Sequence, residues 1–280
     1  MLRNRYLISA LALLLGGCQT AHIGQSSFFP RPAIAPNVVL SAPPGYRMEE
    51  AMIDLPGLGQ VHTIRLDNPG SDATLIYAGG NASFAVTASV TAAALAGATH
   101  ADIILYDYPG RGGTSIPATI DAAISFGPAF VTALRSRGWI GSGALFAYGL
   151  SFGGSQVASI VRAGGFDGAI IEGSVADVAA VGRNFVPGMA KPFVRVQVDP
   201  ALARFDYLAY MAAAKVPILL LSSQDDRYVH PENARDFADA LRKSGLVVTS
   251  LVVPGGHGSA TRQPAAIEAI SAFVSKYGHH

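Results

Sequence analysis

The chain has 280 residues, of which 50% are hydrophobic and only 14% charged, so it can bury one large core and is expected to form one domain with an N-terminal appendage. Its formal net charge is +1, and no run of Lys or Arg could follow a phosphate backbone, which argues against nucleic acid as a partner. The single cysteine, Cys18, excludes an internal disulfide framework and a cysteine-rich metal site.

The N-terminus has the pattern of a bacterial export signal. Two arginines precede an apolar run at 6–15 that is too short to span a bilayer comfortably. The following "LGGC" resembles the lipobox of bacterial lipoproteins, in which the cysteine receives a diacylglyceryl group and the chain is cut just before it. The resemblance predicts a signal peptide at 1–17 and a membrane anchor at lipidated Cys18, with an uncleaved anchor or an ordinary signal as alternatives. Because Gln19 is not an aspartate, the resemblance implies the outer membrane of the cell envelope, on its periplasmic side.

The segment that follows is predicted as a tether. Residues 18–45 are rich in proline and show no sustained period of 2 or 3.6. We therefore expect the folded domain to occupy 46–280, with the tether letting it stand away from a membrane.

Beyond the tether, short apolar runs alternate with longer helical stretches. The helical stretches are rich in alanine, at 83–99, 119–138, 153–164 and 231–245, and the last three end on glycine. The apolar runs are predicted as strands buried on both faces, at 73–80, 101–108, 143–149, 168–174, 216–223 and 247–254. This alternation predicts an α/β fold with a mostly parallel sheet flanked by helices, in which ligands bind beyond the carboxyl ends of the strands.

One such position holds "LFAYGLSFGGS", residues 145–155. Ser151 lies between Gly149 and Gly153, after a predicted strand and before a predicted helix, which is the arrangement of a nucleophile elbow. Glycines are needed at these two positions because a Cβ would collide with the neighbouring strand and helix. The motif is short, so Ser151 as an ordinary turn residue remains the alternative.

A nucleophilic serine needs a histidine base and an acid that orients it. His257 in "VVPGGHGS" follows the last predicted strand, where the base of such a scaffold is expected, although a surface-loop histidine is the alternative. Asp225 and Asp226 both follow the strand predicted at 216–223 and are candidates for the acid. Asp177, after the preceding strand, is a further candidate.

Several of these segments together resemble the α/β-hydrolase superfamily, and within it compact serine hydrolases of the monoacylglycerol-lipase-like and depalmitoylase-like groups. The resemblance covers about 74–277. "LIYAGGNAS" resembles the oxyanion loop of the family, with Gly79 where a histidine usually stands, and "LYDYPGRGGTS" is similar to the Asp-Tyr-x-Gly-x-Gly-x-Ser turn. "SSQDDRYVHPENA" resembles the Gly-x-x-Asp stretch with Ser223 in the glycine position, which implies that Asp226 is the acid.

The resemblance implies a serine hydrolase that cleaves carboxylic esters, with thioesters and lipid esters as further candidates. Ser151 would attack the carbonyl carbon, His257 would take its proton, and Asp226 would hold His257. The backbone N–H groups of Phe152 and Asn81 would form the oxyanion hole. No cofactor is implied, and the spacing of histidines and carboxylates predicts no metal site.

A small cap is expected at about 175–215. It carries large apolar side chains that could serve as core or as an acyl-binding wall, namely Phe185, Met189, Phe193, Phe205 and Tyr207. The expected partners are a small-molecule or lipid ester and, through Cys18, a membrane; no obligate protein partner is evident.

Three other functions compete with an esterase: a non-catalytic binding protein, an acyltransferase and a peptidase of the same fold. A binding protein has no need of all three triad residues. Peptidases of this fold generally carry an additional N-terminal β-domain or a larger cap, for which about 45 residues leave no room.

Overall fold

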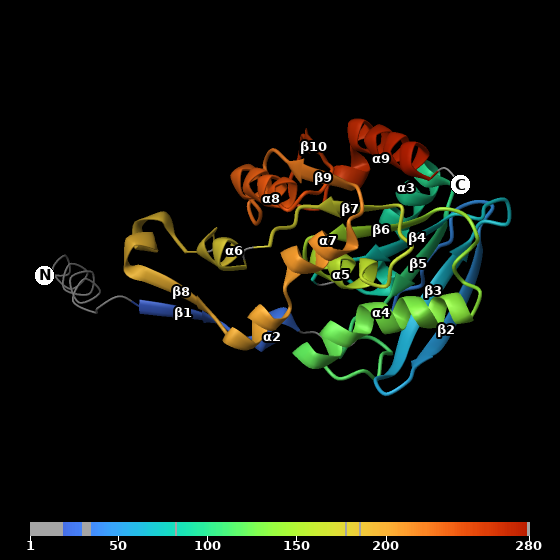
Figure 1. The fold of residues 1–280 in the computed structure, drawn as a ribbon, viewed down its shortest axis with the longest axis horizontal. Helices are drawn as coiled ribbons and strands as arrows, with labels where there is room; N and C mark the ends of the chain where they lie inside the picture. The colour runs from blue at the N-terminus through green and yellow to red at the C-terminus, as the bar shows by residue number, and fades with distance from the viewer. Residues whose placement is uncertain (1–18, 30–34, 82, 177, 185, 279–280) are drawn as a thin grey trace, which may run out of the picture.

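The computed structural model describes residues 19–29, 35–81, 83–176, 178–184 and 186–278. Its centre is an eight-stranded sheet with the strand order β10-β9-β7-β6-β4-β5-β3-β2 (Figure 1). Within this sheet β3 runs against the other strands, which are parallel to one another. The predicted α/β class with a mostly parallel sheet is therefore confirmed. The strands are β2 (Arg47–Leu55), β3 (Gly59–Asp67), β4 (Thr74–Ala78), β5 (Asp102–Tyr106), β6 (Leu145–Leu150), β7 (Gly168–Glu172), β9 (Ile218–Ser223) and β10 (Val248–Val253).

The six apolar runs of the sequence all form strands of this sheet, but β10 is not buried on both faces as predicted, because it is an edge strand and only its Val253 is buried. Every residue of β4, β5, β7 and β9 is buried, as is every residue of β6 before Leu150. Such strands are apolar without alternation because helices cover both faces of the sheet.

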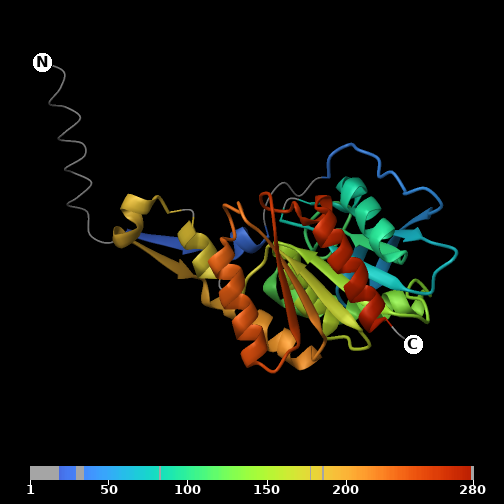
Figure 2. The same cartoon turned by 90° about the horizontal axis from the view of Figure 1, so that it is seen from above.

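Helices pack on both faces of the sheet (Figures 1 and 2). One face carries α4 (Ile120–Ser136), α5 (Phe152–Val161), α7 (Tyr207–Ala214) and α8 (Pro231–Lys243). The other carries α3 (Ser89–Thr99) and α9 (Pro264–Tyr277). The first core is aromatic, with Tyr106 stacked on Phe126 at 5.4 Å between ring centroids, and the second is built on side chains such as Leu95 and Ile270. Short 3₁₀ helices connect the elements: η1 (Ala85–Thr87), η2 (Gly188–Phe193), η3 (Pro200–Arg204) and η4 (Ala260–Arg262).

The antiparallel hairpin β2–β3 has no counterpart among the predicted strands. Most positions of β2 are exposed, because it is an edge strand, and its sequence therefore lacks a continuous apolar run.

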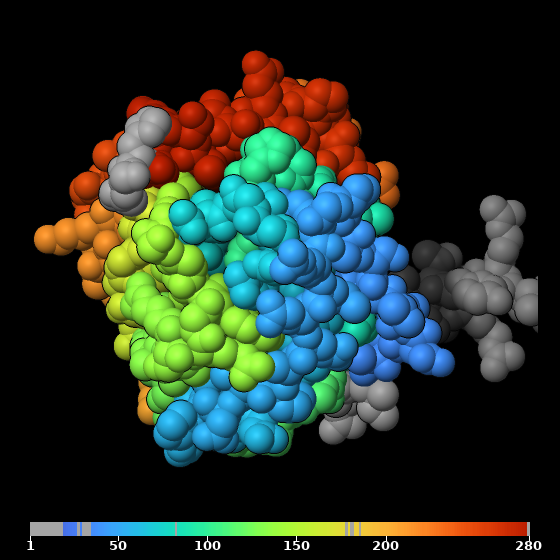
Figure 3. Space-filling view, turned by 90° about the vertical axis from the view of Figure 1, so that its right-hand side faces the viewer, coloured from blue at the N-terminus to red at the C-terminus, as the bar shows by residue number. Residues whose placement is uncertain are grey.

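At the end of the molecule opposite the cap, the blue hairpin region, the yellow-green α4–β6 connection and the red C-terminal helix form one surface (Figure 3).

The cap lies between β7 and α7 and consists of α6 (Val178–Asn184), η2, β8 (Val194–Val198) and η3. Strand β8 pairs in parallel with β1 (Gln19–Ile23), from Gln19 opposite Val194 to Ile23 opposite Val198. This two-stranded ribbon and α6 project from the body of the molecule (Figures 1 and 2).

The structure differs here from the expectation of a tether over 18–45. Within that segment β1 pairs with the cap and is followed by α2 (Gln25–Phe28). The backbone partners of β1 lie more than 170 residues further along the chain, so no local pattern in the segment could reveal them. The signal peptide predicted at 1–17 and Cys18 lie outside the described residues. Within the ranges described, the structure holds no helix of the length and apolar character that crossing a bilayer requires.

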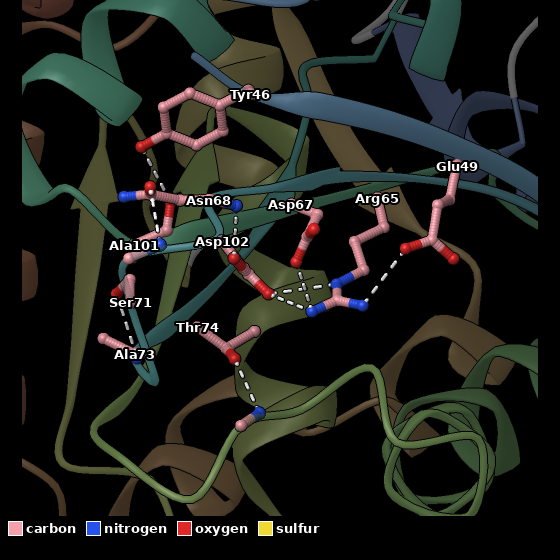
Figure 4. Close-up of polar contacts among 12 residues, drawn as sticks. Tyr46, Glu49, Arg65, Asp67, Asn68, Ser71, Ala73, Thr74, Ala101 and Asp102 are labelled. Carbon is pink, nitrogen blue, oxygen red and sulfur yellow. Dashed lines mark hydrogen bonds and ion pairs between the residues drawn. The ribbon is translucent and has the colours of Figure 1, made fainter.

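A partly buried ionic network fixes the hairpin to the amino ends of the parallel strands (Figure 4). Arg65 on β3 donates to Asp102 from Nε at 3.0 Å and from Nη2 at 2.6 Å, and also pairs with Asp67 at 2.7 Å. The N–H of Asn68 donates to the other oxygen of Asp102 at 2.7 Å. Burial raises the pKa of the Asp102 carboxyl although these hydrogen bonds oppose the rise. Because Asp102 is the first residue of β5, the network lies at the amino ends of the parallel strands. Parallel sheets bind ligands at the opposite, carboxyl ends.

At the other end of β5, His62 on β3 lies between two carboxylates. Its Nδ1 is 2.7 Å from Asp107 Oδ2 and its Nε2 is 2.6 Å from Glu50 Oε1. Asp107 is 1% exposed, and its second oxygen accepts the N–H of Ala85 at 2.8 Å. The hydrogen bond to Asp107 raises the pKa of His62 to about 8, against the effect of burial and with a further contribution from Glu50. The folded protein therefore favours the imidazolium form.

This pKa predicts how stability depends on pH. Since the folded-state pKa lies above the ordinary 6.5, the contribution of His62 is fully present below about pH 6.5 and is lost as pH rises through about 8. We expect the His62→Gln substitution to lower the free energy of unfolding by about 1–2 kcal/mol more below about pH 6.5 than above about pH 8. Urea unfolding of both proteins across the window measures the difference, and a pH-independent difference would contradict the assignment.

Candidate active site

Ser151 stands between β6 and α5 in a strained backbone conformation. Its φ is 55° and its ψ is −116°, in a region that non-glycine residues rarely adopt. Its N–H donates to the carbonyl of Glu172 at 2.7 Å, and its own carbonyl accepts the N–H of Gly154 at 3.0 Å. Hydrogen bonds on both sides of the residue thus hold the sharp turn from strand to helix.

Close packing around this turn leaves no room for side chains at the glycines. A Cβ on Gly149 would lie 2.5 Å from the carbonyl oxygen of Gly153, and a Cβ on Gly153 would lie 2.0 Å from that of Ala78. A Cβ on Gly154 would lie 2.4 Å from Ser174 Oγ, so this position is confined as well. The first turn of α5 is therefore pressed against the carboxyl end of β4.

Asp226 and His257 form a hydrogen-bonded pair in the loops after β9 and β10. His257 Nδ1 is 2.7 Å from Asp226 Oδ2. The other carboxylate oxygen accepts the N–H groups of Tyr228 at 2.9 Å and Val229 at 2.8 Å. The Asp226 side chain is 1% exposed and that of His257 is 20% exposed. The carboxylate is thus fixed on both oxygens, while the imidazole reaches the surface.

The electrostatics of the pair favour an ionised acid. Burial would raise the pKa of Asp226, but the hydrogen bonds from His257 and from the backbone of Val229 and Tyr228 outweigh it, so that the pKa is lowered. A carboxylate at Nδ1 holds the proton on that nitrogen and leaves Nε2 free to accept one. Of the other candidate acids, Asp225 is exposed, and Asp177 lies outside the described residues.

The His257 loop lies against the strand end that carries Ser151. Gly173 directly follows β7, and a Cβ there would lie 3.2 Å from His257 Cε1 and 3.3 Å from Asp226 Oδ2. A Cβ on Gly258 would be 3.4 Å from the side chain of Leu150, the residue before Ser151. Gly173 also has a φ of 53°. The only sequence signal for this role is that Gly173 is a glycine at the end of an apolar run predicted as a buried strand.

The loop after β4, which contains Asn81, is held by two residues of the turn after β5. The hydroxyl of Tyr108 donates to the carbonyl of Gly79, and Arg111 Nη1 donates to the carbonyl of Asn81. Both side chains are buried, with 4% of Tyr108 and 3% of Arg111 exposed. The turn motif was found in the sequence, but the supporting role of Tyr108 and Arg111 was missed, because main-chain carbonyls have no sequence signature.

The loop has no space for a side chain at position 79. A Cβ on Gly79 would lie 2.6 Å from Ser83 Cβ. The histidine that the family pattern places here would therefore not fit, and Tyr108 is the side chain that fixes the loop at this point.

Glu172 at the end of β7 connects the two halves of the site. Its Oε2 accepts the hydroxyl of Tyr148 at 2.5 Å, and its Oε1 accepts the N–H of Ala260, three residues after His257, at 2.7 Å. Burial raises the pKa of this carboxyl, with the hydrogen bonds from Tyr148 and Ala260 acting in the opposite direction. Because its main-chain carbonyl also binds Ser151, Glu172 positions the serine turn relative to the histidine loop.

A pocket lies next to Phe152, the first residue of α5. Its walls are mostly apolar and include Phe29, from the segment predicted as a tether, together with Tyr108, Pro109, Ala123 and Phe152. Phe152 is the first residue of α5, so its N–H lies at the amino end of this helix, directly after Ser151. Within the described ranges, no three His, Cys, Asp or Glu side chains converge as metal ligands.

The large apolar residues of the cap divide into two groups. Phe205 and Tyr207 are buried in the core, whereas Met189 and Phe193 are exposed. Phe185 lies outside the described residues.

Comparisons with known proteins agree with this fold. Residues 128–279 match the model of the prolyl oligopeptidase family. No curated protein matches the chain. Among solved structures, the chain is similar to an esterase of Pyrococcus furiosus, with a TM-score of 0.69 and 16% identity over 88% of this chain and 98% of that one. An esterase of Rhizomucor miehei gives a TM-score of 0.61 and 16% identity over 85% and 84% of the two chains. At these identities the likeness shows the α/β-hydrolase fold alone; the monoacylglycerol-lipase-like or depalmitoylase-like grouping stays a prediction.

Proposed function

The chain belongs to the prolyl oligopeptidase family of the α/β-hydrolase superfamily, and we propose that it is a serine hydrolase that cleaves carboxylic esters with Ser151, His257 and Asp226. The observation that carries the proposal is the 2.7 Å hydrogen bond between Asp226 and His257 in loops packed against the strained turn of Ser151. A hydrogen-bonded histidine beside a serine at such a turn is the arrangement that activates a hydroxyl for attack.

The proposed reaction passes through an acyl-enzyme. Ser151 Oγ attacks the ester carbonyl carbon while His257 Nε2 takes its proton, and Asp226 stabilises the resulting imidazolium. The tetrahedral oxyanion accepts hydrogen bonds from the N–H groups of Phe152 and Asn81. Collapse expels the alcohol, which receives the proton from His257. Water then attacks the acyl-enzyme with His257 as base, releasing the acid and restoring Ser151.

Tyr108 and Arg111 support this role of the loop after β4. By binding the carbonyls of Gly79 and Asn81, they fix the two peptide planes on either side of the one that carries the proposed Asn81 donor. An oxyanion donor must be placed before the charge develops, because reorganisation during the reaction would reduce its benefit.

Two substrate classes compete for this site. The apolar side chains of Phe29, Pro109 and Phe152 next to the serine turn favour an acyl or aryl group, and the similar structures from Pyrococcus furiosus and Rhizomucor miehei are esterases. The family match favours peptides as the second candidate, since the family is named for an oligopeptidase. Thioesters, lipid esters and acyl transfer use the same triad and remain within the proposal, whereas a non-catalytic binding protein would have no need of the Asp226–His257 pair.

The proposal places the enzyme at the bacterial cell envelope, in the outer membrane facing the periplasm. The lipobox-like "LGGC" and the apolar run before it support lipidation of Cys18.

The identity of the acid is tested by a matched pair of neighbouring carboxylates. We expect Asp226→Asn to lower kcat on the order of 10³- to 10⁴-fold, because an amide no longer holds His257 in the reactive tautomer. Asp225→Asn should change kcat by less than about twofold, since that side chain is exposed. Steady-state kinetics with circular dichroism as a folding control measure both. An inactive Asp225→Asn beside an active Asp226→Asn would reverse the assignment.

The substrate class is tested by comparing p-nitrophenyl esters of acetate, butyrate, octanoate and palmitate with alanyl and prolyl p-nitroanilides. Each kcat/KM is divided by the uncatalysed rate, because aryl esters are intrinsically more reactive than arylamides. We expect the highest normalised value for an ester, with the preferred chain length reporting which acyl groups the site accepts, and no activity in Ser151→Ala. A higher normalised value for a prolyl arylamide would make the chain a peptidase.

A further inference from the structure

Two large apolar side chains of the cap are directed to solvent. Met189 is 93% exposed and Phe193 is 55% exposed, and both belong to η2. Neither serves the core nor lines the pocket beside Phe152. Exposed methionine and phenylalanine close together on a projecting element are typical of a surface that meets another apolar phase.

Basic residues share the cap segment with these side chains. The segment 178–198 contains Arg183, Lys191 and Arg195 and no acidic residue. All three basic residues are exposed. On β8, the valines are partly covered whereas Arg195 faces solvent. The cap thus combines exposed apolar side chains with positive charge, which complements an anionic phospholipid surface.

The first described residues pair with the cap. Strand β1 starts at Gln19, which is paired with Val194 on β8. Lipidated Cys18 would therefore be one peptide unit, about 3.8 Å between Cα atoms, from the residue of β1 that pairs with the cap. The anchor would hold the cap at the membrane instead of letting the domain stand away from it.

The cap in turn contacts the candidate active site. Asn184 at the end of α6 donates from Nδ2 to the carbonyl of Tyr228 at 2.9 Å. The Tyr228 ring contacts the His257 ring edge-on, with 5.2 Å between their centroids. If the cap lies on lipid, the contacts from Asn184 to Tyr228 and from Tyr228 to His257 therefore connect the membrane-bound element to the candidate active site.

From these observations we propose that the η2–β8 surface of the cap, comprising Met189, Lys191, Phe193 and Arg195, lies on an anionic phospholipid membrane. The proposal rests on the lipidation of Cys18 in the proposed function. It narrows the substrate class to esters that reach the site from the membrane surface.

The test places a fluorescent probe on the cap of the full-length, membrane-inserted protein. When Cys18 is lipidated, Met189→Cys supplies the only free thiol for the probe. Val39→Cys is the matched control, because Val39 is a comparably exposed apolar residue, at 83%, next to Leu40 in the body of the molecule. Both labelled proteins are reconstituted in phosphatidylcholine vesicles with and without phosphatidylglycerol, and quenching by doxyl-labelled lipid is measured.

We expect the probe at position 189 to be quenched at least about threefold more than the probe at position 39, and more strongly when phosphatidylglycerol is present. Adding Lys191→Glu and Arg195→Glu should remove the dependence on phosphatidylglycerol. Equal quenching at the two positions, or absence of protein from the vesicles, would overturn the proposal.

Two controls separate this proposal from the proposed function. Reaction of the wild-type protein with the thiol probe would show an unmodified Cys18 and would remove the anchor on which the proposal rests. Hydrolysis of a soluble p-nitrophenyl ester should be unchanged by the cap substitutions. Quenching at position 189 without any ester hydrolysis would retain the membrane surface and reject the esterase.

Discussion

The positive φ of Ser151 is the constraint on which the rest of the site depends. A left-handed backbone costs a non-glycine residue roughly 1–2 kcal/mol, so the surrounding structure must impose it. It does so through the hydrogen bond to Glu172 on β7 and through a first turn of α5 so close to β4 that Gly153 admits no side chain. The conformation that projects the serine from the sheet is thus a consequence of parallel strands packed tightly against one helix.

Hydrogen bonds from buried polar side chains position the loops around this turn. Glu172 joins the serine turn to the segment after His257, and Tyr108 and Arg111 hold the loop that contains Asn81. His62 and Asp107 connect the same region to the hairpin β2–β3. Each of these residues binds main chain or a buried carboxylate and so supports the geometry that the proposed chemistry needs.

The sequence predicts the central strands well because β4 to β7 and β9 are buried on both faces and therefore form continuous apolar runs. It does not predict the half-exposed strand β2 or the pairing of β1 with β8, because edge positions dilute the pattern and the partners of β1 are remote in the chain. In the site, the motifs locate Ser151, Asp226 and His257. Gly173, Tyr108 and Arg111 escape prediction because their roles depend on packing and on carbonyl oxygens that every residue shares.

The central claim is that Ser151 is a nucleophile activated by His257. Its most direct test is covalent labelling of the folded protein by a fluorophosphonate, followed by mass spectrometry of the digested protein. A single adduct is expected on the peptide that contains Ser151, with labelling lost in Ser151→Ala and strongly slowed in His257→Ala. Absence of an adduct on folded wild-type protein, or an adduct on another residue that persists in Ser151→Ala, would contradict it.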